Sequence, residues 1–239
     1  MSIITMNNVC KNYKNKKALD NVSLCINEGE LFGLLGVNGA GKTTLIKILC
    51  GLTKKTSGNV FINNFNLDSQ IDKIKEIIDI SPQETSVASN LTVKENLEFF
   101  ANLYGDNSLQ KINEVINSFG LGEVLNQKAK TLSGGFQRRL SIAIALISNP
   151  KILFLDEPTL GLDVLSRRKL WEIINKLKQK ITIILTSHYL EEIEYLCDRV
   201  AILSNGKLLN IGTIEQLKQT TNSTSFEDCF VKLVEAENE

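Results

Sequence analysis

GVNGAGKTT, residues 36–44, is the stretch from which the architecture of this 239-residue chain can be predicted. It satisfies the phosphate-loop pattern G-x-x-x-x-G-K-S/T, whose fixed positions are Gly36, Gly41, Lys42 and Thr43. The apolar run of residues 31–35 before it indicates a buried strand, and the apolar run of residues 45–49 after it indicates a helix. The motif therefore lies in the strand–loop–helix context in which such loops hold phosphate groups.

Each residue type in this loop has a physical role. Glycines 36, 39 and 41 let the backbone adopt positive φ angles and approach an anion, so that successive N–H groups converge on phosphate oxygens. The dipole of the following helix adds to that field, while Lys42 brings positive charge to the β- and γ-phosphates and the Thr43 hydroxyl is placed to ligate magnesium. We therefore predict a nucleotide site and not the alternative, a glycine-rich turn before a core helix. Its loop residues are Gly36, Asn38, Gly39, Ala40, Gly41, Lys42, Thr43 and Thr44.

Composition describes an ordinary globular chain, with 43% hydrophobic and 23% charged residues. The 27 Lys and Arg residues balance the 27 Asp and Glu residues, so net charge gives no argument for binding nucleic acid or an anionic membrane surface. The 5 cysteines are scattered without a C-x-x-C pair, which suggests neither a disulfide framework nor a zinc site and fits a reducing cytosol. No apolar run approaches the roughly 20 residues that span a bilayer, so we expect the chain to reach a membrane only through a partner.

The pattern along the rest of the chain predicts an α/β fold whose phosphate-loop core has a mainly parallel sheet. Residues 2–35 predict an N-terminal antiparallel β subdomain. From residue 152 onward, buried strands alternate with helices, as in a parallel sheet that carries helices on both faces. The expected elements are strands over residues 152–155 and 181–185, helices over residues 165–179 and 190–196, and a hairpin over residues 200–210.

Between these parts, residues 84–138 have helical periodicity that begins with a capping box, Thr92-x-x-Glu95. We interpret them as an inserted α-helical subdomain; ordinary core helices of the same domain are the alternative. The predicted division is therefore one domain over residues 1–215, which includes the insertion, followed by residues 216–239. The latter are expected to form a short C-terminal helix and a polar tail that is loosely held from residue 222 onward.

Two adjacent carboxylates, Asp156 and Glu157, end the strand predicted over residues 152–155. Magnesium-dependent hydrolysis beside a phosphate loop requires such a pair. Asp156 can hold the ion through its water shell, and Glu157 can orient or deprotonate the attacking water. Two solvated carboxylates at a strand end are the alternative interpretation.

A second glycine-containing stretch, LSGGFQ at residues 132–137, places a hydroxyl and two glycines ahead of a helix. This arrangement also binds anions. One phosphate loop already serves the chain's own nucleotide, so a second anion site implies a second ligand or a second copy of the chain. By spacing alone, a plain loop before a helix is the better interpretation.

Taken together, these motifs resemble the complete and correctly ordered motif set of the ATP-binding cassette ATPases. The residues that carry the resemblance are GVNGAGKTT at 36–44, Gln83, LSGGF at 132–136, ILFLDEP at 152–158, Gly161-Leu162-Asp163 and His188. The match covers about residues 2–215. Phe136 stands where Gln is common in the family and Val164 where Pro is frequent, and neither departure removes a catalytic group.

The resemblance implies a role for each motif residue around the chain's own nucleotide. Tyr13 would stack on the adenine ring; an exposed turn tyrosine is the alternative. Gln83 would touch magnesium and the attacking water, and His188, the only histidine, would contact the γ-phosphate and position that water. The implied catalytic residues are Glu157, His188, Gln83 and Lys42, and the implied magnesium ligands are Thr43, Gln83 and Asp156.

The resemblance also implies that two cassettes act together. Ser133, Gly134 and Gly135 would hold the γ-phosphate bound by the opposite protomer, and Asp163 would lie at the dimer interface. ATP would then join two cassettes head to tail with two nucleotides between them. A homodimer and a heterodimer with another cassette are both consistent with the sequence.

Most cassettes of this family energise transporters, so the resemblance implies a separate integral membrane permease and a peripheral position at the cytoplasmic face of the cell membrane. GLLGVNGAGKTT and TSHYLEEIEYLCDRVAIL are similar to cassettes of ABC-2-type exporters, which move drugs, ions, lipids or polysaccharides. Importer cassettes for sugars usually carry a longer C-terminal regulatory domain, whereas this chain ends soon after Gly212. Export is therefore the favoured direction.

Two other functions are weighed against this one. Soluble cassettes that act on ribosomes or DNA usually carry two cassettes in one chain or a long coiled-coil insertion, and neither feature is present. The neutral charge also disfavours them, so no nucleic-acid partner is expected. A regulatory module that binds ATP without turnover is disfavoured because Lys42, Glu157 and His188 are all present.

Overall fold

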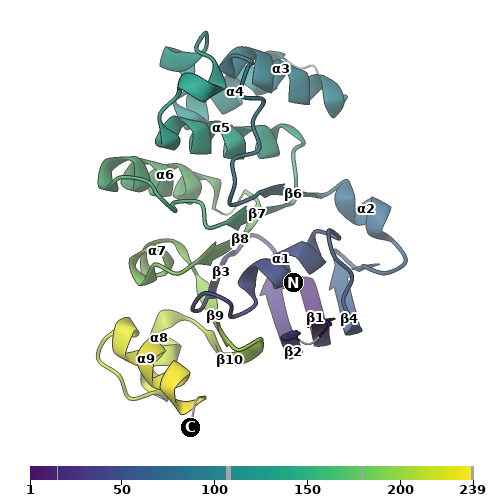
Figure 1. Ribbon diagram of the computed structural model, residues 1–239, viewed down its shortest axis with the longest axis vertical. Coiled ribbons are helices and arrows are strands. Elements are labelled where there is room, and N and C mark those ends of the chain that lie inside the picture. The colour runs from purple at the N-terminus through teal and green to yellow at the C-terminus, as the bar shows by residue number, and fades with distance from the viewer. Residues whose placement is uncertain (15, 106–108, 179, 238–239) are drawn as a thin grey trace.

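The computed structural model of the chain describes residues 1–14, 16–105, 109–178 and 180–237. It contains two sheets, with helix α1 (Lys42–Leu49) packed between them (Figure 1). The phosphate-loop residues lead directly into α1, so the two sheets together position its N-terminus. None of the helices in the described residues has the length and apolar character that crossing a membrane requires.

The smaller sheet is antiparallel, with the strand order β2-β1-β4-β5. Its strands are β1 (Ser2–Tyr13), β2 (Lys16–Asn27), β4 (Ser57–Ile62) and β5 (Phe65–Asn66). In β2, Val22, Leu24 and Ile26 are buried while the residues between them are exposed, because one face packs on the core and the other meets solvent. Strands β1 and β2 confirm the predicted N-terminal antiparallel unit, which β4 and β5 complete.

The larger sheet has the strand order β10-β9-β3-β8-β7-β6. Its strands are β3 (Leu31–Leu35), β6 (Ile78–Ser81), β7 (Ile152–Asp156), β8 (Thr182–Ser187), β9 (Arg199–Ser204) and β10 (Lys207–Gly212). All neighbours pair in parallel except β10, which pairs with β9 antiparallel at the edge. The predicted mainly parallel sheet and its C-terminal hairpin are confirmed. The carboxyl ends of β3, β7 and β8 meet at one edge, where the candidate site residues follow them.

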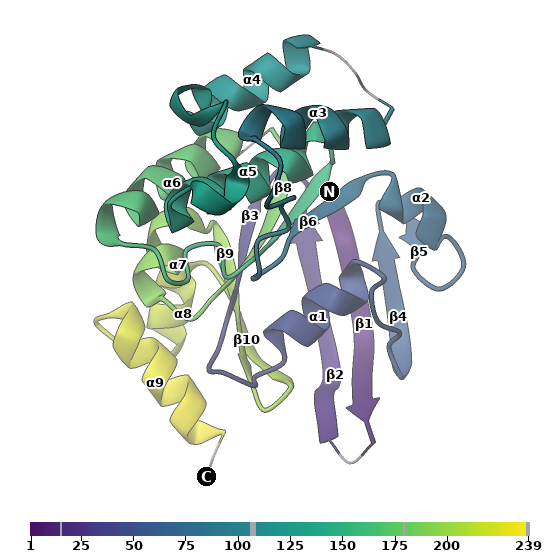
Figure 2. The same cartoon turned by 45° about the horizontal axis from the view of Figure 1, so that its top comes forward.

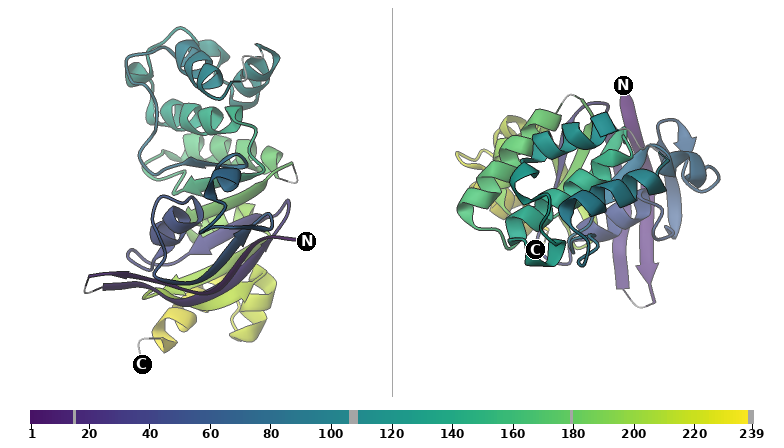
Figure 3. Two further views of the ribbon diagram at one scale, coloured as in Figure 1. Left: turned by 90° about the vertical axis from the view of Figure 1, so that its right-hand side faces the viewer. Right: turned by 90° about the horizontal axis from the view of Figure 1, so that it is seen from above.

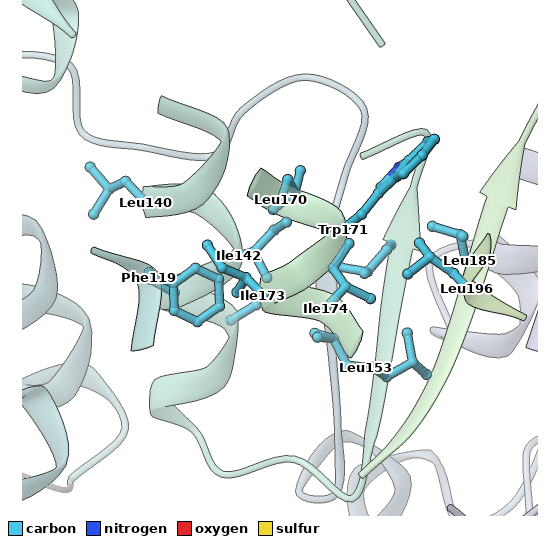
Figure 4. Close-up of a cluster of buried hydrophobic side chains, with 14 of the residues drawn as sticks. Phe119, Leu140, Ile142, Leu153, Leu170, Trp171, Ile173, Ile174, Leu185 and Leu196 are labelled. Atoms are coloured by element: carbon cyan, nitrogen blue, oxygen red, sulfur yellow. The ribbon is translucent and has the colours of Figure 1, made fainter. Parts of the chain in front are cut away.

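Helices α5 (Gly134–Ile147), α6 (Val164–Leu177) and α7 (Leu190–Leu196) pack with the larger sheet in a second core, separate from the core around α1. Figure 4 shows part of this second core, with Ile173 and Ile174 of α6 between Phe119 on one side and Leu185 of β8 on the other. Helices α6 and α7 confirm the helices predicted over residues 165–179 and 190–196. Gln179, the last residue of the first of these ranges, lies outside the described residues. The sheet is thus covered on both faces, which explains why its central strands β3, β7 and β8 are buried along their whole length.

Helices α3 (Val93–Leu103) and α4 (Leu109–Phe119) lie beyond α5 and pack on it, away from the larger sheet (Figure 2). Two 3-10 helices, Gly122–Val124 and Ala129–Thr131, lie between α4 and α5, and the short helix α2 (Ile71–Lys75) precedes β6. The predicted capping box is confirmed at α3, where the Glu95 N–H donates to the Thr92 hydroxyl and the Thr92 N–H donates to the Glu95 carboxylate. Residues 106–108 of the predicted insertion lie outside the described residues.

The C-terminal segment forms two helices, α8 (Ile214–Thr220) and α9 (Phe226–Ala236), at the end of the molecule opposite α3 and α4 (Figure 3). The expectation of a loosely held tail from residue 222 onward is therefore wrong. Ser225 caps α9, and Phe226 and Cys229 are buried. With Phe230 and Leu233 they form the i, i+3, i+4, i+7 stripe of an amphipathic helix. Residues 238 and 239 of the predicted tail lie outside the described residues.

Candidate active site

The loop between β3 and α1 passes close to two other strands, and glycine makes this possible. At Gly36, an added Cβ would lie 2.3 Å from the carbonyl oxygen of Leu203 in β9. At Gly41, φ is 107°, and an added Cβ would lie 2.8 Å from the carbonyl oxygen of Ala18 in β2. The loop is therefore fixed against β9 and β2, and α1 begins at Lys42 with N–H groups that have no partner within the helix.

A cavity of about 580 Å³ lies beside this loop. The predicted residues that line it are Tyr13, Asn38, Gly39, Ala40, Gly41, Lys42, Thr43, Thr44, Gln83, Glu157 and His188. They come from segments far apart in the sequence, which the fold brings to one edge of the larger sheet. Lys16, Ala18 and Leu160 also line the cavity, and no sequence motif indicates them. Lys16 could have been found from strand pairing, because it lies opposite Tyr13 across the β1–β2 hairpin.

Tyr13 stands at the rim of the cavity, at the end of β1, with 42% of its surface exposed. The ammonium group of Lys11 lies 4.5 Å from the centroid of its ring and donates a hydrogen bond to the carbonyl oxygen of Lys54 at 2.7 Å. A cation so placed attracts the ring face. The tyrosine ring is thus held from the side of β1 while it lines the cavity.

Lys42 is buried inside the loop. Its Nζ donates to the carbonyl oxygens of Gly36 at 2.6 Å and Val37 at 3.3 Å. Burial lowers the pKa of Lys42, and the nearby carboxylates of Glu157 and Asp156 oppose that shift. Because an ammonium with little hydration interacts strongly with an anion, this side chain is well placed to bind phosphate.

Asp156 ends β7 as a buried carboxylate whose neighbours are hydroxyls. Thr186 of β8 donates to Asp156 Oδ1 at 2.6 Å, and the Thr43 hydroxyl lies 3.4 Å from the same oxygen. Mg²⁺ takes hard oxygen ligands and usually combines one or two protein ligands with substrate phosphates and waters. The described residues hold no cluster of three His, Cys, Asp or Glu that could bind a metal alone. Asp156 and Thr43 therefore suit a magnesium ion shared with a bound phosphate.

Glu157 and His188 lie next to each other in the wall of the cavity. Glu157 Oε1 lies 3.5 Å from His188 Nδ1, and both residues line the cavity with Gln83. The backbone of Glu157 is left-handed, with φ at 48°, a strained conformation for a residue with a side chain. Its N–H donates to the hydroxyl of Thr186 at 2.9 Å. The strand thus ends in a fixed turn that directs the second carboxylate, not the first, toward the open space.

The remaining predicted residues lie outside this cavity. Ser133 caps α5 and is exposed, Gly135 is packed against Ser166 at the start of α6, and Gly134 lies near Leu162. Asp163 caps α6, where its carboxylate accepts from the N–H groups of residues 165 and 166 at 3.0 Å each. The structure therefore brings the 133–135 segment and Asp163 together in a second place, apart from the loop and Glu157.

The parallel sheet, the loop with a buried lysine before α1, and the acidic end of β7 define a phosphate-loop nucleotide-binding protein. The family model described as ABC transporter matches residues 19–160 of the sequence. The chain belongs to this family of ATP-binding cassette proteins, as the motif set predicts.

Named relatives and a solved structure agree with this assignment. The chain is 37% identical over 242 residues to the probable multidrug ABC transporter ATP-binding protein YbhF of Escherichia coli, covering 98% of this chain and 42% of YbhF. It is 40% identical over 210 residues to the linearmycin resistance ATP-binding protein LnrL of Bacillus subtilis, covering 86% of this chain and 68% of LnrL. The dimeric, post-hydrolysis structure of the ATP-binding cassette MJ0796 with ADP and Pi matches with a TM-score of 0.79 and 29% identity, over 88% of this chain and 98% of that one. The chain thus spans less than half of the length of YbhF.

Proposed function

We propose that the chain binds ATP with Mg²⁺ and hydrolyses it to ADP and phosphate, as the nucleotide-binding subunit of a transporter. The observation that carries this proposal is the single cavity that joins the phosphate loop, Glu157, His188 and Gln83. Each of these groups alone has a structural explanation. Their convergence on one space beside a desolvated lysine favours phosphate chemistry.

In this proposal the phosphate groups lie against the loop and the start of α1. The N–H groups of residues 38–44 and the ammonium of Lys42 hold the β- and γ-phosphates, and Tyr13 stacks on the adenine ring. Mg²⁺ supplies positive charge to the same phosphates, with Thr43, Asp156 and Gln83 as the protein groups that hold it and its water shell.

The hydrolytic step is assigned to Glu157. Its carboxylate orients or deprotonates a water that attacks the γ-phosphorus, while His188 contacts the γ-phosphate and keeps that water in line. Support comes from the 3.5 Å approach of Glu157 to His188 and from the fixed backbone that directs Glu157 into the cavity. Gln83, which lines the same cavity, completes the water position.

A second copy of the chain, or another cassette, completes the site in this proposal. Ser133, Gly134 and Gly135 lie at the N-terminus of α5 but away from the chain's own cavity, so the γ-phosphate they bind belongs to the partner. The proposal is supported by the likeness to a cassette whose solved structure is dimeric. The closed pair forms only while γ-phosphates bridge it, and hydrolysis releases it.

The mechanical output goes to a separate integral membrane permease at the cytoplasmic face of the cell membrane. Helices α3 and α4 expose large apolar side chains, and the segment after Gln83 links them to the cavity. The exposed residues are Phe99 and Leu103 of α3, Tyr104 directly after it, and Leu109 of α4. The names of YbhF and LnrL favour export of drug-like molecules. Neither name supports action on ribosomes or nucleic acid.

The test uses Glu157→Gln, which keeps the loop but removes the proposed base. We expect this variant to bind ATP, to lose hydrolysis and to accumulate as a dimer that size-exclusion chromatography with light scattering detects. Solubilised gently from native membranes with ATP, it should retain a permease in equal amount, whereas Lys42→Ala should not form the ATP-held dimer. Brisk hydrolysis by Glu157→Gln would remove Glu157 from its role, and copurifying ribosomes or DNA would replace the transporter proposal.

A further inference from the structure

Arg138 is a buried charge that the mechanism above does not use. It lies in the second turn of α5 with 4% of its surface exposed. Burial lowers the pKa of Arg138 to about 10, although the charges of Asp156, Glu192 and Glu157 oppose the shift. A buried guanidinium is costly to leave unpaired. Its hydrogen bond partners therefore show which parts of the chain this charge holds in place.

The guanidinium donates to four backbone carbonyl oxygens. Nε donates to Pro158 at 2.8 Å, and Nη2 donates to Asp156 at 2.8 Å. Nη1 donates to Pro82 and, at 3.4 Å, to Gln83. One side chain thus holds the carbonyls on both sides of Glu157 and, at the same time, the backbone at Gln83.

These contacts bear on the strained turn that directs Glu157 into the cavity. The peptide group before Glu157 and the one after Pro158 cannot rotate without breaking a charge-assisted hydrogen bond in a desolvated place. Thr186 also holds the N–H of Glu157. The left-handed conformation of Glu157, with φ at 48°, is therefore maintained by three hydrogen bonds in and beside the turn.

We propose that Arg138 is a positioning residue that fixes Glu157 and Gln83 relative to each other and to the N-terminus of α5. The inference rests on the proposed role of Glu157. It adds a mechanical link, because α5 begins at Gly134, directly after Ser133, where the partner's γ-phosphate is proposed to bind. A shift of α5 on dimer closure is transmitted by one buried, hydrogen-bonded side chain to the carboxylate and glutamine of the chain's own site.

The first test replaces Arg138 by lysine, which keeps the charge but lacks the planar fork that reaches several carbonyls at once. We expect kcat for ATP to fall about 10- to 100-fold, as small misplacements of catalytic groups do. The dissociation constant for ATP should stay nearly unchanged because the loop and Tyr13 are untouched.

Arg139→Lys is the matched control. Arg139 is the next residue of α5 and is similarly buried, with 7% exposed, but its Nη1 donates to the carbonyl oxygen of Phe119 in α4. We expect this variant to lose thermal stability like Arg138→Lys while keeping kcat. Equal losses of kcat in the two variants would overturn the positioning role in favour of a general packing effect.

The second test combines Arg138→Lys with Glu157→Gln and measures the residual single-turnover rate with radiolabelled ATP. If Arg138 acts mainly by fixing Glu157, the two effects do not multiply, and Arg138→Lys should slow Glu157→Gln far less than it slows the wild-type chain. A further loss that multiplies the two single effects would overturn the proposal.

If Arg138→Lys does not fold, Arg138→Gln goes through the same measurements. Full activity of Glu157→Gln would refute the proposed function itself, whereas an inactive Glu157→Gln with multiplicative effects would refute only the role of Arg138.

Discussion

At the residue scale, one hydroxyl connects the two carboxylates of the proposed site. Thr186 Oγ1 accepts from the N–H of Glu157 and donates to Asp156 Oδ1 at 2.6 Å. It is fully buried in β8, so water cannot replace it without rearrangement. The two carboxylates therefore keep different orientations, Asp156 toward Thr43 and Glu157 toward the cavity.

We predict that Thr186→Val, which keeps the shape and removes the hydroxyl, lowers both activity and stability. A buried acceptor left without its donor costs about 1–3 kcal/mol, which lowers the midpoint of thermal unfolding by about 2–4 °C for each kcal/mol in a chain of this size. The rate of ATP hydrolysis should fall because the backbone of Glu157 loses a fixed point. Calorimetry and a steady-state phosphate-release assay measure the two effects.

Thr182→Val is the control for this prediction. Thr182 is also buried in β8, but at its other end, where its hydroxyl accepts from the Gly29 N–H at 2.9 Å. It should lose stability and keep kcat. Should both valine variants keep full hydrolysis, the hydroxyl of Thr186 would have no part in positioning Glu157.

At the element scale, α6 and α7 are joined by a buried carboxyl. Glu192 of α7 is fully buried and accepts from the indole Nε1 of Trp171 at 2.9 Å. Burial raises the pKa of Glu192, and its hydrogen bonds with Ser187 and Trp171 reduce the shift. An acid whose folded pKa exceeds its ordinary value of 4.5 stabilises the fold while protonated. That stabilisation is complete below pH 4.5 and is lost as the pH rises through the folded pKa.

We therefore predict that Glu192→Gln raises the thermal midpoint at pH 8, because the amide keeps an acceptor for Trp171 and carries no charge. The gain should shrink as the pH is lowered toward 4.5, the ordinary pKa of the group. Glu194→Gln, an exposed change on the same helix, should leave the midpoint unchanged across the series. A Glu192→Gln loss of stability that is equal at every pH would contradict this account.

The elements differ in how well the sequence predicts them, and the reason is physical. Strands such as β3 and β7 are continuous apolar runs that end in motif residues, so their place and direction follow from local pattern. Helix α9 was not predicted, because its apolar stripe is short and is interrupted by the acidic residues that follow Ser225. Arg138 was missed because its partners lie in segments 82–83 and 156–158, at the ends of β6 and β7, which only the folded sheet brings to α5.

At the scale of the whole molecule, the predicted site residues fall into two groups that do not meet within one chain. Tyr13, the loop and Glu157 share the cavity, whereas Ser133 and Asp163 cap α5 and α6 in a second place. The sequence alone predicts both groups but cannot place them relative to each other, because the distance between them depends on how α5 and the sheet pack. If both groups act on one nucleotide, they come from different chains.

This arrangement predicts complementation between inactive variants. In a head-to-tail pair, each site takes Lys42 from one chain and Ser133 from the other. Mixing Lys42→Ala chains with Ser133→Arg chains then places both defects in one site and leaves the other intact. A mixed dimer keeps one of its two sites intact, so the mixture should regain ATP hydrolysis, up to about half of the wild-type rate, in a phosphate-release assay. Lys42→Ala mixed with Glu157→Gln is the control, since both residues serve the same chain's cavity and each site keeps one defect. Activity in the control mixture, or none in the first, would mean that the second group does not serve its partner's nucleotide.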